Sequence, residues 1–345
     1  MGRGQREDDH EGVYHPDYLG KVARKGDLVS RLNTLHKSLQ SLSQDLSDRP
    51  SGLQATAMQL VSEKMLKHQD KDVRLLAVCC IVDIFRVFAP EAPYGDEEMV
   101  TVFDVINNQI RSLSNYEITS ATGSKVLYIL TSLATVKSCV VPVIMAQGGV
   151  PGADDVMAGL FDALISSFRA DHGEEGMYSS APWKHTSPAP APAPASPLLF
   201  CLSYSSPLIL SSSPASTHMC NILQACIEEC DDIDQDLLDI LLSPLLPAAK
   251  AENPVAYKYV GTVMRRCAGC IQNSVSAFVN HVLVGTSIPG KTKSSELADH
   301  VYPLVFELHK ISPGLLLRVL PNICAQLQAE EEDIRLKVPF TSRII

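Results

Sequence analysis

Two pairs of cysteines have spacings at which thiols can bind a metal ion or exchange disulfides. Cys267 and Cys270 form a Cys-x-x-Cys motif, and Cys226 and Cys230 are about one helical turn apart. A zinc site needs further ligands, and neither a second pair nor a histidine follows at ligand spacing. Both pairs lie in apolar patterns of helical period, and the motif lies in the stretch 263–271 of a helix predicted over residues 254–271. We therefore interpret all four as packed free thiols and predict no metal site and no cofactor.

The usual signatures of catalytic sites are missing from the sequence. It contains no GxSxG, no HExxH and no glycine-rich loop ending in Lys-Ser/Thr. A Gly-Lys-Thr triplet at residues 290–292 lacks the upstream glycine and the strand that a phosphate-binding loop requires. Without a convergent set of titratable side chains, we predict that the protein is not an enzyme. Four scattered histidines are interpreted as surface groups or satisfied core groups: His68, His281, His300 and His309.

The densest charge in the sequence is acidic. Residues 228–239 carry seven Asp or Glu in twelve positions. Such a run is either a solvated turn, whose acids favour the start of the next helix, or a binding site for a basic partner. We favour the solvated turn. The net charge of the chain is −10, which argues against general electrostatic binding of DNA, so we expect no direct nucleic-acid contact.

Helices must position these residues. The helix predicted at residues 71–88 is the central one, on which the other helices are expected to pack. Between Asp72 and Phe88, 13 of 17 residues are apolar, which indicates a helix buried on several sides. The polar residues Asp72, Asp83 and Arg86 fall within about 60° of one another and predict a narrow solvent-exposed strip. Pro90 ends the helix because proline has no N–H to donate and restricts the residue before it.

The same pattern recurs along the chain without strand alternation. Helices of about 12–18 residues joined by short turns give a period of about 40 residues per pair. This period predicts an all-α HEAT-repeat solenoid, in which roughly six to seven antiparallel helix pairs are stacked. The predicted helices cover residues 18–46, 53–67, 71–88, 96–113, 120–136, 140–147, 154–168, 217–229, 233–249, 254–271, 274–284, 294–310 and 313–328, with Asp154 suited to cap its helix.

Five segments follow from this pattern. Residues 1–16 are predicted to be a disordered, charged head, and residues 17–169 and 217–337 HEAT-type helices. Residues 170–216 hold eight prolines and a serine-rich remainder, which predicts a disordered insertion; a retained intron or an error in the gene model is the alternative. Residues 338–345 are expected to form an irregular, truncated end of the array, because Pro339 interrupts the last helix.

Compartment can be inferred from the cysteines and from the N-terminus. The ten cysteines lie mainly in helical patterns and not in a loop framework, which is typical of free thiols in a reducing compartment. The N-terminal residues are charged and contain no apolar signal-peptide core. No run reaches the roughly 18 apolar residues of a membrane span, so we expect a soluble intracellular protein without membrane contact.

A short signature supports the repeat assignment. An acid, a small apolar residue and an arginine recur at the start of the second helix of HEAT repeats. The arginine can pair with the acid and with helix-end carbonyls of adjacent repeats, which ties one unit to the next. Two copies far apart in the sequence favour an array. The first copy consists of Asp70, Val73 and Arg74, and the second of Asp333, Ile334 and Arg335.

The run DVRLLAVCCIVDIFRVFAPEAPY at residues 72–94 carries a more specific resemblance. It resembles the N-terminal region of the cohesin-associated regulators named for precocious dissociation of sisters. Those proteins have a DVRLL-type helix, a DIFR segment and an acidic Ala-Pro-x-Ala-Pro-Tyr turn. A looser similarity extends through most of residues 53–336.

The turn at residues 89–94 has two interpretations. It can be a rigid connection between helices, or a platform whose two prolines fix the backbone and present Glu91 and Tyr94 to a peptide. In the resembled family this turn is part of a surface used by cohesin-release and cohesion-protecting partners, although Glu91 stands where Asp is common. The resemblance therefore implies a partner-binding site at Ala89, Pro90, Glu91, Ala92, Pro93 and Tyr94.

The resemblance also implies a function. The protein would be a nuclear, chromosome-associated scaffold that regulates cohesin in the maintenance and release of sister-chromatid cohesion and in DNA repair. Its expected partners are cohesin subunits and cohesin release or protection factors, bound by peptide capture. This chain would correspond to the N-terminal part of such a protein. The alternative is a generic HEAT-repeat adaptor in nuclear transport or phosphatase assembly.

Overall fold

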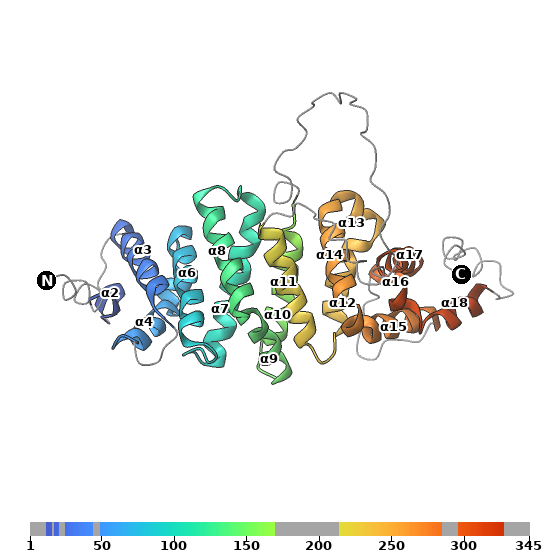
Figure 1. Ribbon diagram of the computed structural model, residues 1–345, viewed down its shortest axis with the longest axis horizontal. Helices are drawn as coiled ribbons and strands as arrows, with labels where there is room; N and C mark the ends of the chain where they lie inside the picture. The colour runs from blue at the N-terminus through green and yellow to red at the C-terminus, as the bar shows by residue number, and fades with distance from the viewer. Residues whose placement is uncertain are drawn as a thin grey trace, which may run out of the picture.

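The computed structural model describes residues 12–15, 17–20, 25–43, 49–169, 214–284 and 296–327. Within these ranges the regular elements are all helices, so the prediction of an all-α protein is confirmed. Figure 1 shows them as an elongated row that runs from the N-terminus to the C-terminus in the order of the sequence. Each helix pair therefore contacts mainly its neighbours, as in a solenoid.

The bounds of the helices are as follows. They are η1 Gly12–Tyr14, α2 Asp17–Gly20, α3 Lys25–Ser41, α4 Leu53–Leu60, α5 Glu63–Leu66, α6 Lys71–Phe88, α7 Asp96–Ser112, η3 Leu113–Asn115, α8 Ala121–Val136, η4 Ser138–Val140, α9 Val141–Gln147, α10 Ala153–Ser166, α11 Pro214–Glu229, α12 Gln235–Leu242, η6 Ser243–Leu245, α13 Pro247–Glu252, α14 Pro254–Arg266, α15 Ala268–Val284, α16 Glu296–Asp299, α17 Val301–Ile311, η7 Pro313–Leu316 and α18 Leu320–Leu327.

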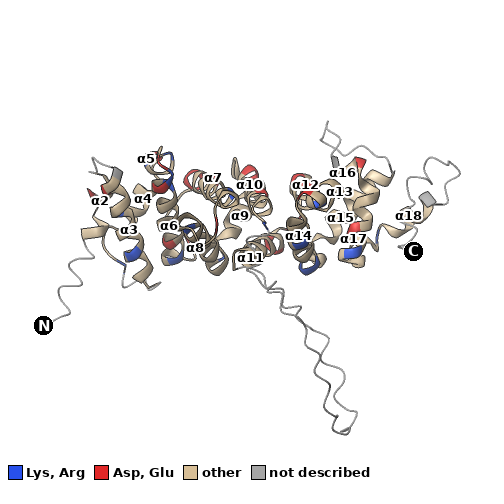
Figure 2. Ribbon diagram, turned by 90° about the horizontal axis from the view of Figure 1, so that it is seen from above, with Lys and Arg blue, Asp and Glu red and all other residues tan. Residues whose placement is uncertain are grey.

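The long helices form two rows. In one row α3 packs on α6, α6 on α8, α8 on α11, α11 on α14 and α14 on α17. In the other, α7 packs on α10, α10 on α12 and α12 on α15. Figure 2 shows the two rows from above. Buried apolar residues from the helices of both rows belong to one core.

The central helix α6 is buried as predicted, because α3, α4, α5, α7 and α8 all pack against it. Nearly every residue from Val73 to Val87 is buried. The predicted solvent strip is wrong at Asp83, which is fully buried, while Asp72 is exposed and Arg86 half-buried. Helical geometry placed these three side chains on one face, but α3 and α8 cover the middle of that face.

Several predicted helices are shorter than expected because turns interrupt them. The helix expected at residues 233–249 is divided into α12 and α13 by η6, which contains Pro244, and Pro247 begins α13. The break expected near residue 272 falls instead at Cys267, between α14 and α15. The expected cap at Asp154 is also wrong, because Gly152 precedes α10 and Asp154 lies in its first turn.

Two predicted boundaries are corrected, and other predictions lie outside the described residues. Tyr14, in the head expected to be disordered, is fully buried and its hydroxyl lies 2.8 Å from Ser38 Oγ. Helix α11 begins at Pro214, inside the expected insertion, and buries Ala215 and Ser216 because they face the core. Residues 1–11, 170–213 and 328–345 fall outside the described ranges, and with them the second signature at Asp333, Ile334 and Arg335.

Among the described helices, none has by itself the length and apolar composition needed to cross a membrane. One bent pair, Ala121–Val136 with Ser138–Gln147, meets both criteria when its two parts, which meet at 85°, are taken together.

Candidate partner-binding surface

The predicted site lies in the connection between α6 and α7. Helix α6 ends at Phe88 and α7 begins at Asp96, and we call residues 89–94 the Ala-Pro turn. Pro90 cannot continue the helix, and the Glu91 N–H donates to the Phe88 carbonyl at 3.2 Å. The peptide bond between Ala89 and Pro90 is cis. The turn is therefore a compact connection that begins directly on the last turn of α6.

Tyr94 is half-buried and packs against the core, so only part of its side chain is presented to solvent. Its ring meets Phe85 edge-on at a centroid distance of 6.1 Å, and Phe85 stacks on Phe103 of α7 at 5.8 Å. The Tyr94 hydroxyl is buried and has no hydrogen-bond partner among the described residues. This burial raises the pKa of Tyr94 far above its ordinary value. Tyr94 therefore anchors the turn, because the aromatic ring is the largest apolar group available to it.

Pro90 and Glu91 are the exposed part of the turn, while Ala92 and Pro93 are half-buried. Ala92 and Tyr94 pack against the core. The turn thus presents one carboxylate on a backbone that is held at its C-terminal end by an aromatic anchor. Such an arrangement can pair with a basic side chain at low entropic cost, because little motion remains to be lost on binding.

Arg49 supports the helix end from which the turn begins, and the sequence analysis did not identify it. Its guanidinium lies over the Phe88 ring at 4.4 Å from the centroid, and Nη2 donates to the Val87 carbonyl at 2.8 Å. The sequence placed Arg49 only in a break between helices. The sequence carries no signal for this contact, because Arg49 lies 38 positions before Val87.

A polar seam fixes α6 against α3 and α8. Asp83 Oδ2 lies 2.7 Å from His36 Nδ1 on α3, and Asp83 Oδ1 accepts a hydrogen bond from the Tyr128 hydroxyl on α8 at 2.5 Å. Burial and the bond to Asp83 raise the pKa of Tyr128. Arg86 donates to the Leu42 and Leu39 carbonyls at 2.8 and 2.7 Å, at the C-terminal end of α3. These contacts hold α6, and therefore the turn, in a fixed position.

The repeat signature has a more local role than predicted. Asp70 caps α6, because its Oδ1 accepts from the backbone N–H groups of Asp72 and Val73 at 2.9 and 3.3 Å. Arg74 Nη1 donates to the His68 carbonyl and to the Gln69 carbonyl, the latter at 3.0 Å. The hydrogen bonds seen for Arg74 therefore bind the loop before its own helix and not an adjacent repeat, since that loop folds back within reach.

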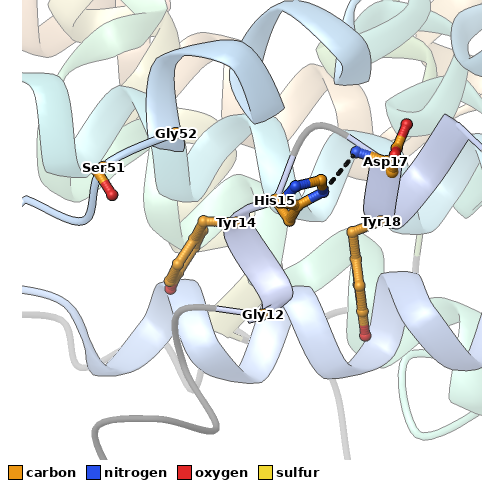
Figure 3. A pocket seen from close by; sticks show the side chains of 7 residues that line it. All are labelled: Gly12, Tyr14, His15, Asp17, Tyr18, Ser51 and Gly52. Carbon is orange, nitrogen blue, oxygen red and sulfur yellow. Dashed lines mark hydrogen bonds between the residues drawn. The ribbon is translucent and has the colours of Figure 1, made fainter.

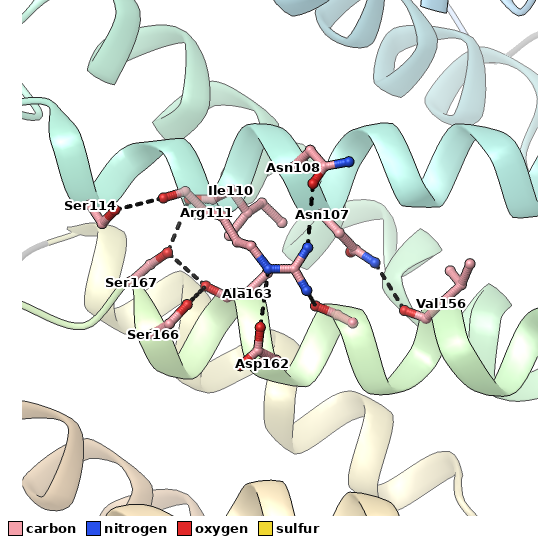
Figure 4. A network of polar contacts seen from close by, with 11 residues as sticks. Asn107, Asn108, Ile110, Arg111, Ser114, Val156, Asp162, Ala163, Ser166 and Ser167 are labelled. Atoms are coloured by element: carbon pink, nitrogen blue, oxygen red, sulfur yellow. Dashed lines mark hydrogen bonds and ion pairs between the residues drawn. The ribbon is translucent and has the colours of Figure 1, made fainter. Parts of the chain in front are cut away.

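Adjacent repeats are connected instead by the network between α7 and α10 (Figure 4). Arg111 donates to Asp162 Oδ2 and to the Gly159 carbonyl, both at 3.1 Å. Asn107 Nδ2 donates to the Val156 carbonyl at 2.9 Å, and it is buried. A side chain at position 159 would approach this network closely, with its Cβ 3.1 Å from Asn107 Nδ2.

The members of each cysteine pair differ in exposure. Cys267 ends α14 and is buried, whereas Cys270 is exposed on α15. Burial, followed by the Glu228 carboxylate, raises the pKa of Cys267 to about 12. Cys226 Sγ donates to the Cys139 carbonyl at 3.2 Å. Among the described residues no group of three or more His, Cys, Asp or Glu is arranged to hold a metal ion.

A separate pocket of about 770 Å³ lies at the N-terminal end of the solenoid (Figure 3). Tyr14, His15, Asp17 and Tyr18 line it, and the Asp17 N–H donates to His15 Nδ1 at 3.1 Å. The Tyr14 hydroxyl is bonded to Ser38 inside the core and is not available to a ligand. This pocket does not include any residue of the Ala-Pro turn.

Two rows of stacked helix pairs that carry a fixed surface turn define a helical-repeat protein of the HEAT type. Comparison with known proteins specifies the family. A family model described as sister chromatid cohesion protein PDS5 matches residues 26–341. The chain therefore belongs to the PDS5 family of sister chromatid cohesion proteins.

Individual relatives agree with this assignment. The chain is 29% identical over 315 residues to the PDS5 homolog B-A of Xenopus laevis, which covers 91% of this chain and 18% of the relative. It is 29% identical over 336 residues to the human homolog B, covering 96% and 20%. It is 28% identical over 334 residues to the Gallus gallus homolog A, covering 96% and 21%. The chain thus spans about a fifth of the length of these relatives.

A solved structure shares the fold. The chain from a structure of a Pds5–Scc1 complex superposes with a TM-score of 0.65 and 20% sequence identity. The match covers 94% of this chain and 42% of the other chain. The prediction of a HEAT-repeat solenoid is therefore confirmed.

Proposed function

We propose that this chain is a non-enzymatic scaffold that regulates cohesin on chromosomes by capturing peptides of its partners. Membership of a family of sister chromatid cohesion proteins carries this proposal. The partners are cohesin subunits together with cohesin release and protection factors. The protein acts in the nucleus, in the maintenance and release of cohesion and in DNA repair. A net charge of −10 favours docking through proteins over direct binding of DNA.

The Ala-Pro turn is the site that we assign to peptide capture. Glu91 offers an exposed carboxylate, and Pro90 offers exposed apolar surface beside it. Tyr94 and Arg49 keep the turn from moving, the first through its packing on Phe85 and the second through the Val87 carbonyl. A partner segment with a basic residue next to an apolar one matches this surface.

The packing of Tyr94 against the core determines how the site is tested. Replacing Tyr94 with Ala would empty part of the core and would disturb folding as well as binding. Glu91→Lys reverses the exposed charge and leaves the packing unchanged. Glu117→Lys, at another exposed acid in a different loop, is the matched control.

The experiment is an affinity capture from nuclear extract with quantitative mass spectrometry. We expect the wild type and the Glu117→Lys variant to recover cohesin subunits or a cohesin release factor. The Glu91→Lys variant should recover much less of at least one of these proteins. Equal recovery by all three proteins would move the capture site away from the turn. Recovery of transport or phosphatase components without cohesin would contradict the proposed function as a whole.

A further inference from the structure

Two hollows lie next to each other at the edge of the solenoid, on the two sides of the turn between α11 and α12. The first, which we call the α9 groove, has a volume of about 160 Å³ and contains Val143 and Leu237 in its apolar floor. The second, the α15 groove, has a volume of about 330 Å³ and contains Leu238 and Phe278. Asp232 lines both, so the two grooves form one continuous surface.

The rim of this surface is acidic. Asp154, Asp232 and Asp234 line the α9 groove. The sequence around it, residues 138–168 and 214–249, has three and seven Asp or Glu respectively, and neither range contains Lys or Arg. Figure 2 shows acidic segments of α7, α10 and α12 along the same edge of the molecule. Acidic side chains therefore dominate this edge, and the basic group that reaches it, Arg318, donates to Asn273 in the α15 groove at 2.6 Å.

The carboxylates at the rim are held in place by neutral donors. Asp232 Oδ1 accepts from Ser274 Oγ on α15 at 2.8 Å, and Asp234 caps α12. Gln147 Nε2 on α9 donates to the Glu229 carbonyl at 3.0 Å, which ties α9 to the end of α11. These bonds position the acidic groups without cancelling their charge. The surface is therefore formed before any ligand arrives.

The thiol of Cys230, in the α9 groove, responds to this field. Burial raises its pKa to about 11, together with the negative charges of Asp234, Asp231 and Glu229. Burial is the larger cause and would disfavour any charge, but the second cause, the neighbouring carboxylates, would favour a cation here.

We propose that the α9 and α15 grooves form a docking site for a basic peptide segment in which Lys or Arg residues alternate with aliphatic ones. The aliphatic side chains would enter the grooves, and the basic groups would pair with Asp154 and Asp232 on the rim. This site is separate from the Ala-Pro turn and does not depend on the function proposed for that turn.

The dimensions support a peptide over a small molecule. Pockets for small ligands usually measure about 300–1,000 Å³ and enclose most of the ligand. The α9 groove is smaller than this range and the α15 groove lies at its lower end. Two shallow grooves separated by one carboxylate instead match neighbouring side chains of an extended segment.

Fluorescence anisotropy with a short labelled peptide of alternating arginine and leucine tests the proposal at low ionic strength. We expect the double variant Asp154→Asn/Asp232→Asn to bind this peptide about tenfold more weakly than the wild type, because it removes two charges but keeps the size of both side chains. Asp27→Asn/Glu117→Gln, which neutralises two exposed acids outside the grooves, should bind as the wild type does. Equal affinities for the wild type and the groove variant would overturn the proposal.

Two further comparisons separate groove binding from a general charge effect. A peptide of alternating arginine and serine should bind clearly more weakly than the arginine–leucine peptide, and equal binding would contradict insertion into the grooves. On the wild type, the arginine–leucine peptide should slow alkylation of Cys230, measured by mass spectrometry. Cys270, exposed on α15 and not in the lining of either groove, is the internal control. Unchanged alkylation of Cys230 at saturating peptide would also overturn the proposal.

Discussion

Asp83 shows how a single polar residue can determine the position of a whole helix. Its side chain is only 1% exposed, and it bonds His36 and Tyr128 from the two helices that flank α6. The sequence pattern assigned Asp83 to solvent from its angular position on α6 alone. That position contains no information about which other helices pack on α6. Tyr94 gives a similar example, because the sequence could not show that its hydroxyl is buried while the residue as a whole is half-buried.

We predict that Asp83→Ala destabilises the protein by about 1–3 kcal/mol, because it leaves the half-buried polar groups of His36 and Tyr128 without their acceptor. Urea denaturation followed by circular dichroism measures the change. Asp72→Ala, an exposed acid on the same helix, is the control and should cost about 1 kcal/mol or less. A similar loss for both variants would show that the seam contributes little.

Glu307 should make part of the stability depend on pH. Burial raises its pKa, but hydrogen bonds from Tyr257, Lys310 and Lys250 outweigh this, so that the pKa lies below the ordinary value of 4.5. A carboxylate with a lowered pKa stabilises the folded state above its ordinary value, and this contribution is lost as the pH falls through the folded-state pKa. We therefore expect the difference in unfolding free energy between wild type and Glu307→Gln to be constant above about pH 5 and to shrink below pH 4.5.

Denaturation at a series of pH values measures that difference. The exposed Glu117 provides a control, since Glu117→Gln should change stability little across the series. A difference for Glu307→Gln that does not vary with pH would mean that its carboxylate is not selectively stabilised by folding.

At the scale of the helices, close approach determines which glycines can be replaced. A Cβ added to Gly123 in α8 would lie 2.0 Å from the Glu117 backbone carbonyl, which cannot move away easily. A Cβ added to Gly269 in α15 would have no atom within 4 Å. The same substitution should therefore have opposite effects at these two positions.

We predict that Gly123→Ala lowers stability by about 1–3 kcal/mol through overpacking, even though alanine is the better helix former. Gly269→Ala should raise it by up to about 1 kcal/mol, because it adds helix propensity without a clash. Thermal unfolding of the two variants measures both changes. A stabilising effect at Gly123 would indicate that the α8 N-terminus relaxes freely.

Helical period predicted the presence and order of the long helices well, because each has a long apolar face. It could not locate breaks that depend on tertiary contacts, such as the one at Cys267, since the residues there are compatible with a helix. For the candidate site, the sequence located the Ala-Pro turn from its prolines. The support from Arg49 could not be predicted. It depends on a tertiary contact, in which Arg49 reaches the carbonyl of Val87, 38 positions later in the sequence.

At the scale of the whole molecule, a solenoid should respond to damage locally. Leu32 on α3 is fully buried against α6, and Leu304 on α17 is fully buried at the other end of the stack. Each pair contacts mainly its neighbours, so a defect at one end is not transmitted directly to the other.

We predict that Leu32→Ala, which should cost about 2–5 kcal/mol, reduces amide hydrogen-exchange protection mainly in α3 and α6. Leu304→Ala should reduce it mainly in α14 and α17. Hydrogen–deuterium exchange with peptide-level mass spectrometry compares the two patterns. Uniform loss of protection along the chain in both variants would show that the array unfolds as a single unit.

The buried hydroxyl of Tyr94 also restricts how the Ala-Pro turn can be modified. A tyrosine kinase must bring the phenolic oxygen into its active site, and in this structure that oxygen is covered. A phosphate there would place up to two negative charges in the covered space that the hydroxyl now occupies, on a ring that packs against Phe85. Phosphorylation of Tyr94 would therefore require the turn to open and would keep it open. The modification would displace the turn from its position on α6 in addition to changing the charge of the turn.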